Sequence, residues 1–239
     1  NKKDLVEIPE KIIKDIKTKQ NFSKSDISIT SLIEQKIKDT RQNKFLINSS
    51  RFKLRLFKMY SRILLQKQDF KTLEQFLLTS YSDFKKNKFF DRENHDEKLT
   101  LLTYLVNCLY ENKKYKTSLK YVKDLRKSMK EYDGFLEEKY MFYYYNALVL
   151  NYGKTDKSKS LDTLKEASKN VHINKIPAYT SFIYLNTAVL YYQTNRFSLA
   201  KKNISRLILQ HDFINLDSVF QFQVFIFELM LRIELGEKD

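Results

Sequence analysis

From residue 51 onward, apolar stretches alternate with polar segments at regular intervals. Four stretches are apolar on nearly every face, at residues 52–65, 99–110, 138–152 and 180–192. Each is followed by a polar corner and then by an amphipathic segment with apolar residues every three or four positions. This pattern predicts pairs of helices, in which the first helix packs between neighbours and the second turns one face to solvent.

The amphipathic segments share one register, counted from an aromatic residue after the polar corner. That residue is Phe70, Tyr115 or Phe197 in three copies, and Lys157 takes its place in the other. A small or apolar residue follows three positions later, at 73, 118, 160 and 200, which gives intervals of 45, 42 and 40 residues. Four copies in one register predict an internal repeat of helix hairpins.

The composition agrees with an all-α fold. The chain of 239 residues contains only 3 Gly and 2 Pro, and tight turns between antiparallel strands favour those residues. Hydrophobic residues make up 42% of the chain, which is enough for a sizeable core without cross-links. Long helices joined by polar corners are therefore expected.

The repeat resembles the tetratricopeptide repeat family. The large residue of the first helix matches Phe57, Leu102, Tyr144 and Tyr184, and the small residues of the second helix match Ser118, Ser160, Ala167 and Ala200. Leu73 fits that small-residue position poorly, and the period is longer than the roughly 34 residues of that family. The resemblance implies an α-solenoid of stacked antiparallel helix hairpins.

The resemblance covers residues 51–239, with about four repeats and a fifth first helix. The copies lie near residues 52–90, 99–131, 138–170, 180–211 and 216–235. The fifth is apolar and ends at a polar corner, so we expect a continuing chain or a partner to cover that end. Residues 1–50 do not fit the register and are predicted to form an N-terminal helical segment or cap; a DNA-binding helical module is the alternative there.

The formal charge of +15 introduces a second class of function. Such a basic chain is compatible with nucleic-acid or anionic-membrane binding. The lysines are spread along the chain, however, and abundant Lys, Asn, Ile, Phe and Tyr together are also what an A+T-rich coding sequence produces. Two interpretations of the basic residues therefore stay open: a solvated surface without a binding role, and a surface that binds nucleic acid or an anionic membrane.

No catalytic, cofactor-binding or metal-ligating constellation is visible, and we expect the chain not to be an enzyme. His95, His172 and His211 are far apart and lack Cys or carboxylate partners at ligand spacing. The segment around His95 is interpreted as an exposed charged connector. Gly153 and Gly236 each follow a first helix, where a left-handed helix cap is expected.

No run of 18 apolar residues and no secretory signal is seen, so no membrane span and a cytoplasmic location are predicted. A removed signal or lipid anchor stays open, since the chain begins at Asn1. The single cysteine, Cys108, excludes an intramolecular disulfide framework and is interpreted as a buried apolar residue.

The family resemblance also implies a partner-binding groove lined by the first helices. Carried over onto this sequence, its positions are Arg55, Lys58, Arg62, Thr103, Asn107, Tyr110, Phe142, Tyr145, Val149, Tyr152, Phe182, Leu185, Val189 and Tyr192. We expect a non-enzymatic protein–protein interaction scaffold, a helical-repeat segment of a larger assembly or regulator, that captures a peptide or helix with acidic character. The alternative is a transcription-regulatory or nucleic-acid-associated protein. The sequence names no partner and no oligomeric state.

Overall fold

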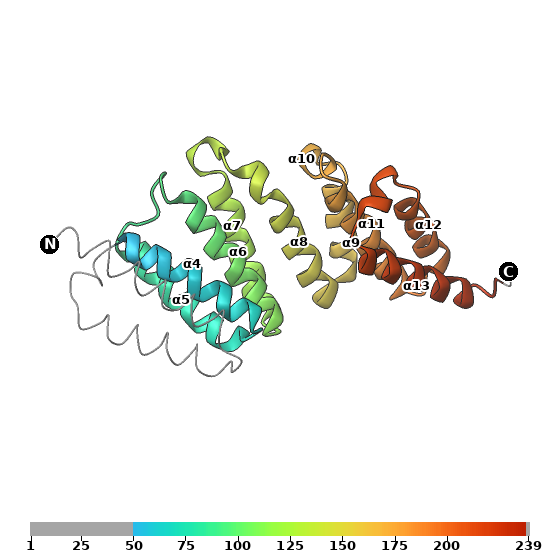
Figure 1. Cartoon of the computed structure of the whole chain (residues 1–239), viewed down its shortest axis with the longest axis horizontal. Coiled ribbons are helices and arrows are strands. Elements are labelled where there is room, and N and C mark those ends of the chain that lie inside the picture. The colour runs from blue at the N-terminus through green and yellow to red at the C-terminus, as the bar shows by residue number, and fades with distance from the viewer. Residues whose placement is uncertain (1–49, 238–239) are drawn as a thin grey trace. The chain divides into compact units, whose positions relative to one another are not determined.

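The computed structural model describes residues 50–237 and places 82% of them in helices, with no strand in that range. The all-α prediction is confirmed for these residues. The helices are α4 (Ser50–Gln66), α5 (Phe70–Lys86), α6 (His95–Glu111), α7 (Tyr115–Met129), α8 (Glu137–Thr155), α9 (Lys157–Ala167), α10 (Val171–Asn174), α11 (Pro177–Tyr192), α12 (Phe197–Ile208) and α13 (Ser218–Glu234), with 3-10 helices η1 (Glu131–Gly134) and η2 (His211–Asn215) (Figure 1). The predicted N-terminal segment or cap lies outside the described residues, apart from Ser50.

The described residues divide into two compact units, one up to Tyr104 and one from Leu105 onward, and the boundary falls within α6. In the first unit, α4 packs against α5 as a helix hairpin. The ring of Phe57 on α4 meets the ring of Phe84 on α5 edge to face at 6.1 Å between centroids. Phe57 was predicted to be the large buried residue of its repeat, and it is 1% exposed.

The corners between paired helices repeat the same backbone geometry in three copies. Gln68, Lys113 and Asn195 each lie two residues before the aromatic residue of the register, and their φ angles are +54°, +59° and +56°. The residue after each of them donates its backbone N–H to the carbonyl five residues back, on Leu64, Leu109 and Tyr191 respectively. This is the hydrogen bond of a Schellman motif, which ends a helix and reverses the chain.

The corner between α8 and α9 is built differently. Helix α8 continues through Gly153 to Thr155, and Gly153 does not have a positive φ, so its predicted left-handed cap is wrong. Asp156 takes an extended conformation instead and accepts a hydrogen bond from the backbone N–H of Lys159 at 3.1 Å. One residue thus ends α8 and caps α9. The same expectation is confirmed for Gly236, which has φ +67°.

In the second unit, the small residues of the register are buried between the paired helices. Ser118, Ser160 and Ala200 are all 0% exposed. The Ser118 hydroxyl donates to the carbonyl of Val106 at 2.8 Å, and the Ser160 hydroxyl donates to that of Val149 at the same distance. A small side chain lets the two helices approach closely, and the carbonyl satisfies the buried hydroxyl. The predicted register therefore marks the helix contacts.

Candidate partner-binding surface

The basic residues predicted on the first helix of the repeats lie on α4. Arg55 is half-buried, whereas Lys58 and Arg62 are exposed. The Lys58 ammonium lies 2.6 Å from a carboxylate oxygen of Glu97, so part of its charge is neutralised within the first unit. Thr103 donates its hydroxyl proton to the carbonyl of Leu99 at 2.9 Å and is half-buried.

The second unit carries a cluster of four aromatic rings, one exposed and three half-buried, here called the aromatic surface: Tyr143 and Phe142 on α8, and Tyr179 and Phe182 on α11. Phe142 stacks on Tyr179 with 3.9 Å between ring centroids and 6° between the planes. Phe182 meets Phe142 edge to face at 5.2 Å, and Tyr143 lies 5.9 Å from the same ring. Two predicted positions, Phe142 and Phe182, thus come together in space.

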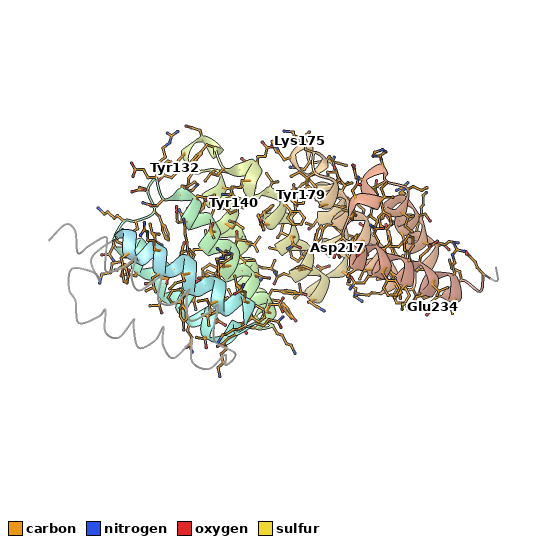
Figure 2. All side chains as sticks on the ribbon, viewed as in Figure 1. Tyr132, Tyr140, Lys175, Tyr179, Asp217 and Glu234 are labelled. Atoms are coloured by element: carbon orange, nitrogen blue, oxygen red, sulfur yellow. The ribbon has the colours of Figure 1, made fainter. Side chains whose placement is uncertain are left out.

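Sequence reasoning did not identify Tyr143 and Tyr179. Tyr143 is 43% exposed and extends the aromatic surface toward solvent. Tyr179 precedes the apolar stretch that was assigned to the fourth copy, in the first turn of α11 beyond Pro177. Figure 2 labels Tyr179 together with Tyr140 of α8. A proline at the start of a helix was the available signal that α11 begins early enough to include this ring.

A polar triad joins the start of α8 to α10 and the residue that follows it. A carboxylate oxygen of Glu138 lies 3.1 Å from the ammonium of Lys175 and 3.3 Å from Nδ1 of His172, which belongs to α10. The hydrogen bond from Lys175 and then that from His172 lower the pKa of the Glu138 carboxyl below its usual value. Figure 2 labels Lys175 and Tyr179, both from the same unit.

Two of the predicted groove residues lie inside the unit instead of on its surface. Tyr145 is 6% exposed and Val149 is 3% exposed. The Tyr145 hydroxyl donates to a carboxylate oxygen of Glu166 on α9 at 2.9 Å, and burial together with this bond raises the pKa of Tyr145 to about 12. Position 145 therefore joins α8 to its paired helix, and neither side chain is available to a partner.

The other predicted groove residues of the second unit are exposed or half-buried. Asn107 is exposed; the half-buried ones are Tyr110, Tyr152, Leu185, Val189 and Tyr192. Tyr192 lies 5.4 Å from the ring of Phe197 and 5.5 Å from that of Phe227, and its hydroxyl donates to Glu234 at 3.3 Å. It connects α11 to α13 and offers only part of its ring outward.

The interpretation of His95 as part of an exposed connector is wrong. His95 begins α6 and is 0% exposed, although its neighbours Arg92 and Glu93 are exposed. The first residue of α6 is therefore part of the buried interior and not of the connector. Within residues 50–237, no three His, Cys, Asp or Glu side chains gather as metal ligands, and no helix has the length and apolar character to cross a membrane.

The outer face of α7 carries a row of lysines, here called the lysine stripe. Its members are spaced alternately four and three residues apart, and all are exposed: Lys116, Lys120, Lys123, Lys127 and Lys130. This spacing places them on one side of a helix. None of the five forms an ion pair with another described residue. The outer face of α7 and the residue after it thus carry five exposed positive charges in one row.

Comparisons with known proteins support the fold and no more. No family model matches the chain, and no curated protein matches it. The crystal structure of BtubC (BKLC) from P. vanneervenii is similar, with a TM-score of 0.58 and 12% sequence identity, over 90% of this chain and 85% of that one. At this identity the likeness concerns an all-helical arrangement alone.

Proposed function

We propose that the chain is a non-enzymatic protein-interaction scaffold, built as an α-solenoid of tetratricopeptide-like hairpins, that holds a partner peptide or helix against its first helices. The repeated corners at Gln68, Lys113 and Asn195 and the buried small residues of the register support the repeat architecture. Such scaffolds present an extended surface formed by successive repeats.

The observation that carries the proposal is the aromatic surface. Four rings on two first helices contact one another and leave Tyr143 exposed by 43%. Because the rings already hold each other in place, a partner that packs on them loses little additional side-chain entropy on binding. Aromatic side chains at the centre of an interface are among those that contribute most to affinity. Lys175, an exposed cation in the same unit as these rings, favours a partner with acidic residues beside its apolar ones.

The test compares two charge insertions of the same kind. Tyr143→Asp changes the aromatic surface, whereas Leu209→Asp changes an apolar residue that is 82% exposed and lies in the segment after α12. Each full-length variant is used as bait for proteins of the native cell, with quantitative mass spectrometry. We expect Tyr143→Asp to reduce the wild-type partners by at least about tenfold and Leu209→Asp to retain them. Equal retention by both variants contradicts the proposal.

The lysine stripe favours the second candidate, a nucleic-acid-associated protein. Five exposed lysines along one face suit a row of phosphates, and affinity for such a row falls steeply with salt because counterions are released on binding. Fluorescence anisotropy with labelled duplex DNA at low and physiological salt tests this, with the variant Lys120→Glu/Lys123→Glu/Lys127→Glu as comparison. Affinity that is strong at low salt, steeply salt-dependent and lost in the triple variant supports this candidate over the first.

A further inference from the structure

The outward face of α13 carries an apolar seam that nothing within the described part of the chain covers. Its residues are spaced alternately three and four positions apart: Val219, Phe222, Ile226, Leu229 and Ile233. They are 61%, 64%, 43%, 58% and 70% exposed, in that order. Isolated exposed apolar residues are common on proteins, but a continuous row of them marks an interaction site.

The opposite side of the same helix is already in use. Val224 and Leu231 are 1% and 0% exposed and belong to the core that includes Ala188, Ile204 and Leu207. On a helix of 3.6 residues per turn, the seam is centred about 180° away from Val224. Helix α13 is therefore apolar on two opposite faces, and its own unit covers one of them.

The alternating spacing of three and four identifies what kind of element fits the seam. Residues with this spacing form a straight row along a helix and interlock with a second helix that crosses at a small angle. The seam contains no charged residue, and Arg232 is the one basic residue in α13. A helix with a similar apolar row is the complement.

The repeat register shows how the equivalent face is covered elsewhere in this unit. Gly236 ends α13 with the left-handed geometry that Asn195 gives to the end of α11. Aligned on these two residues, Leu229 of α13 corresponds to Ala188 of α11. Ala188 is 0% exposed and packs in one core with Ala200 and Ile204 of α12, whereas Leu229 is 58% exposed. The position that a neighbouring helix buries in α11 is open in α13.

We propose that a second copy of the chain covers this seam, through antiparallel pairing of α13 with α13 of the other copy about a two-fold axis at Ile226. In that arrangement Ile226 faces its own equivalent, Val219 faces Ile233, and Phe222 faces Met230. All of these side chains are apolar, and Met230 is 42% exposed. Leu229 faces Gln223, whose side chain is exposed and polar, so the self-complementary part of the interface that a two-fold axis requires consists of the three apolar pairs.

The apolar area agrees with this partner. From the fractional exposures, the seam and its neighbours Phe225 and Met230 present about 700 Å² of apolar side chain, close to the 800 Å² per partner of a standard interface. The chain carries a charge of +15, yet residues 217–237 contain no lysine and have four carboxylates against one guanidinium. The seam therefore lies apart in the sequence from the lysine-rich segments, and its apolar contact has to outweigh the repulsion between two like-charged acidic segments.

Site-directed crosslinking tests the register of the pair in the full chain. Ile226→Cys lies on the proposed axis and is expected to form a disulfide-linked dimer under mild oxidation. Val219→Cys alone is expected not to, whereas Val219→Cys combined with Ile233→Cys is expected to do so. The native Cys108 is 0% exposed, so the wild-type chain serves as the background control. Equal crosslinking of the Val219→Cys and Ile226→Cys single variants overturns the proposed axis.

Sedimentation equilibrium tests the association itself. We expect the wild-type chain to dimerise in the micromolar range, Ile226→Glu to weaken that dimer by at least about a hundredfold, and Leu209→Glu to leave it unchanged. Both substituted positions are exposed, so circular dichroism should show equal helix content in the three chains. A wild-type chain that stays monomeric up to about 100 µM, or a dimer that Ile226→Glu does not weaken, overturns the proposal. The inference does not depend on the proposed scaffold function, because neither the aromatic surface nor the lysine stripe takes part in it.

Discussion

Helices α11 and α13 are two apolar helices of the same unit that end in the same way and have different surroundings. Both continue into a left-handed residue, Asn195 after α11 and Gly236 after α13. Helix α12 packs against both of them. Only α11 has its small residue, Ala188, enclosed by that contact, whereas Leu229 at the corresponding place in α13 is 58% exposed. The comparison shows that an apolar pattern in the sequence predicts a helix with apolar faces. It does not predict which of those faces another helix covers.

The largest expected difference between the two helices comes from a charge at this matched position. Ala188→Glu places a carboxylate where the native side chain is 0% exposed, so we expect a loss of more than about 4 kcal/mol in the free energy of unfolding. Leu229→Glu places the same charge on an exposed face, and we expect a change within about 0.5 kcal/mol at concentrations where the chain is monomeric. Urea denaturation followed by circular dichroism measures both. Similar losses for the two variants would show that the outer face of α13 is covered within one chain.

A second contrast lies within α13 and should be somewhat smaller. Leu231→Ala removes a fully buried side chain from the core and is expected to cost about 2–5 kcal/mol. Ile233→Ala, two residues later, shortens a side chain that is 70% exposed and should cost less than about 0.5 kcal/mol. The same denaturation experiment measures both. If Ile233→Ala proves as costly as Leu231→Ala in the monomer, the assignment of the two faces is wrong.

These contrasts show where sequence reasoning succeeded and where it stopped. The spacing of the second helices predicted that Ser118, Ser160 and Ala200 lie at helix contacts, because burial on one face of a helix leaves a periodic trace. The first helices are apolar on most sides and leave no such trace. The sequence alone therefore could not show that Tyr145 is buried while Tyr143 is exposed. Such a difference depends on which neighbouring helix occupies each side.

Helix ends and corners also show which features the sequence predicts and which depend on the surrounding structure. The cap at Gly236 was predicted, since a glycine after an apolar helix favours the left-handed conformation. The same argument is wrong for Gly153, because Asp156 supplies a different end for α8. The left-handed residues at Gln68 and Lys113 could not be identified from residue type, since neither is a glycine or an asparagine. The register aligned these corners in the sequence, and the structure adds that they share one backbone geometry.

Substitutions at the ends of α11 and α13 should produce the next smaller effect, with opposite signs. Gly236→Ala introduces a Cβ at φ +67° and is expected to cost about 1 kcal/mol. Asn195→Gly relieves a non-glycine residue at φ +56° and is expected to gain no more than about 0.5 kcal/mol, because asparagine already tolerates this conformation. Thermal and urea denaturation of both variants check the signs. A loss of stability in Asn195→Gly would indicate that its side chain has a further role in the corner.

The smallest expected effect concerns the contact that connects the two helices directly. The Tyr192 hydroxyl at the end of α11 donates to a carboxylate oxygen of Glu234 at the end of α13, at 3.3 Å. Partial burial, then the charge of Glu234 and this hydrogen bond, raise the pKa of Tyr192 above its ordinary value of 10.0. The contribution to stability is therefore fully present below about pH 10 and is lost as the pH rises through the higher folded-state pKa.

Tyr192→Phe removes the titrating hydroxyl and keeps the ring that contacts Phe197 and Phe227. We therefore expect the difference in unfolding free energy between wild type and variant to be constant from pH 7 to about pH 9.5 and to shrink above about pH 10, since the wild type then loses the bond that the variant never had. Taking this difference cancels the ionisation of the other tyrosines. The same measurement on Tyr143→Phe, whose hydroxyl lies outside this contact, is the matched control. A difference that grows with pH would mean that the ionised hydroxyl is the better-stabilised form, and that Glu234 does not accept its proton in solution.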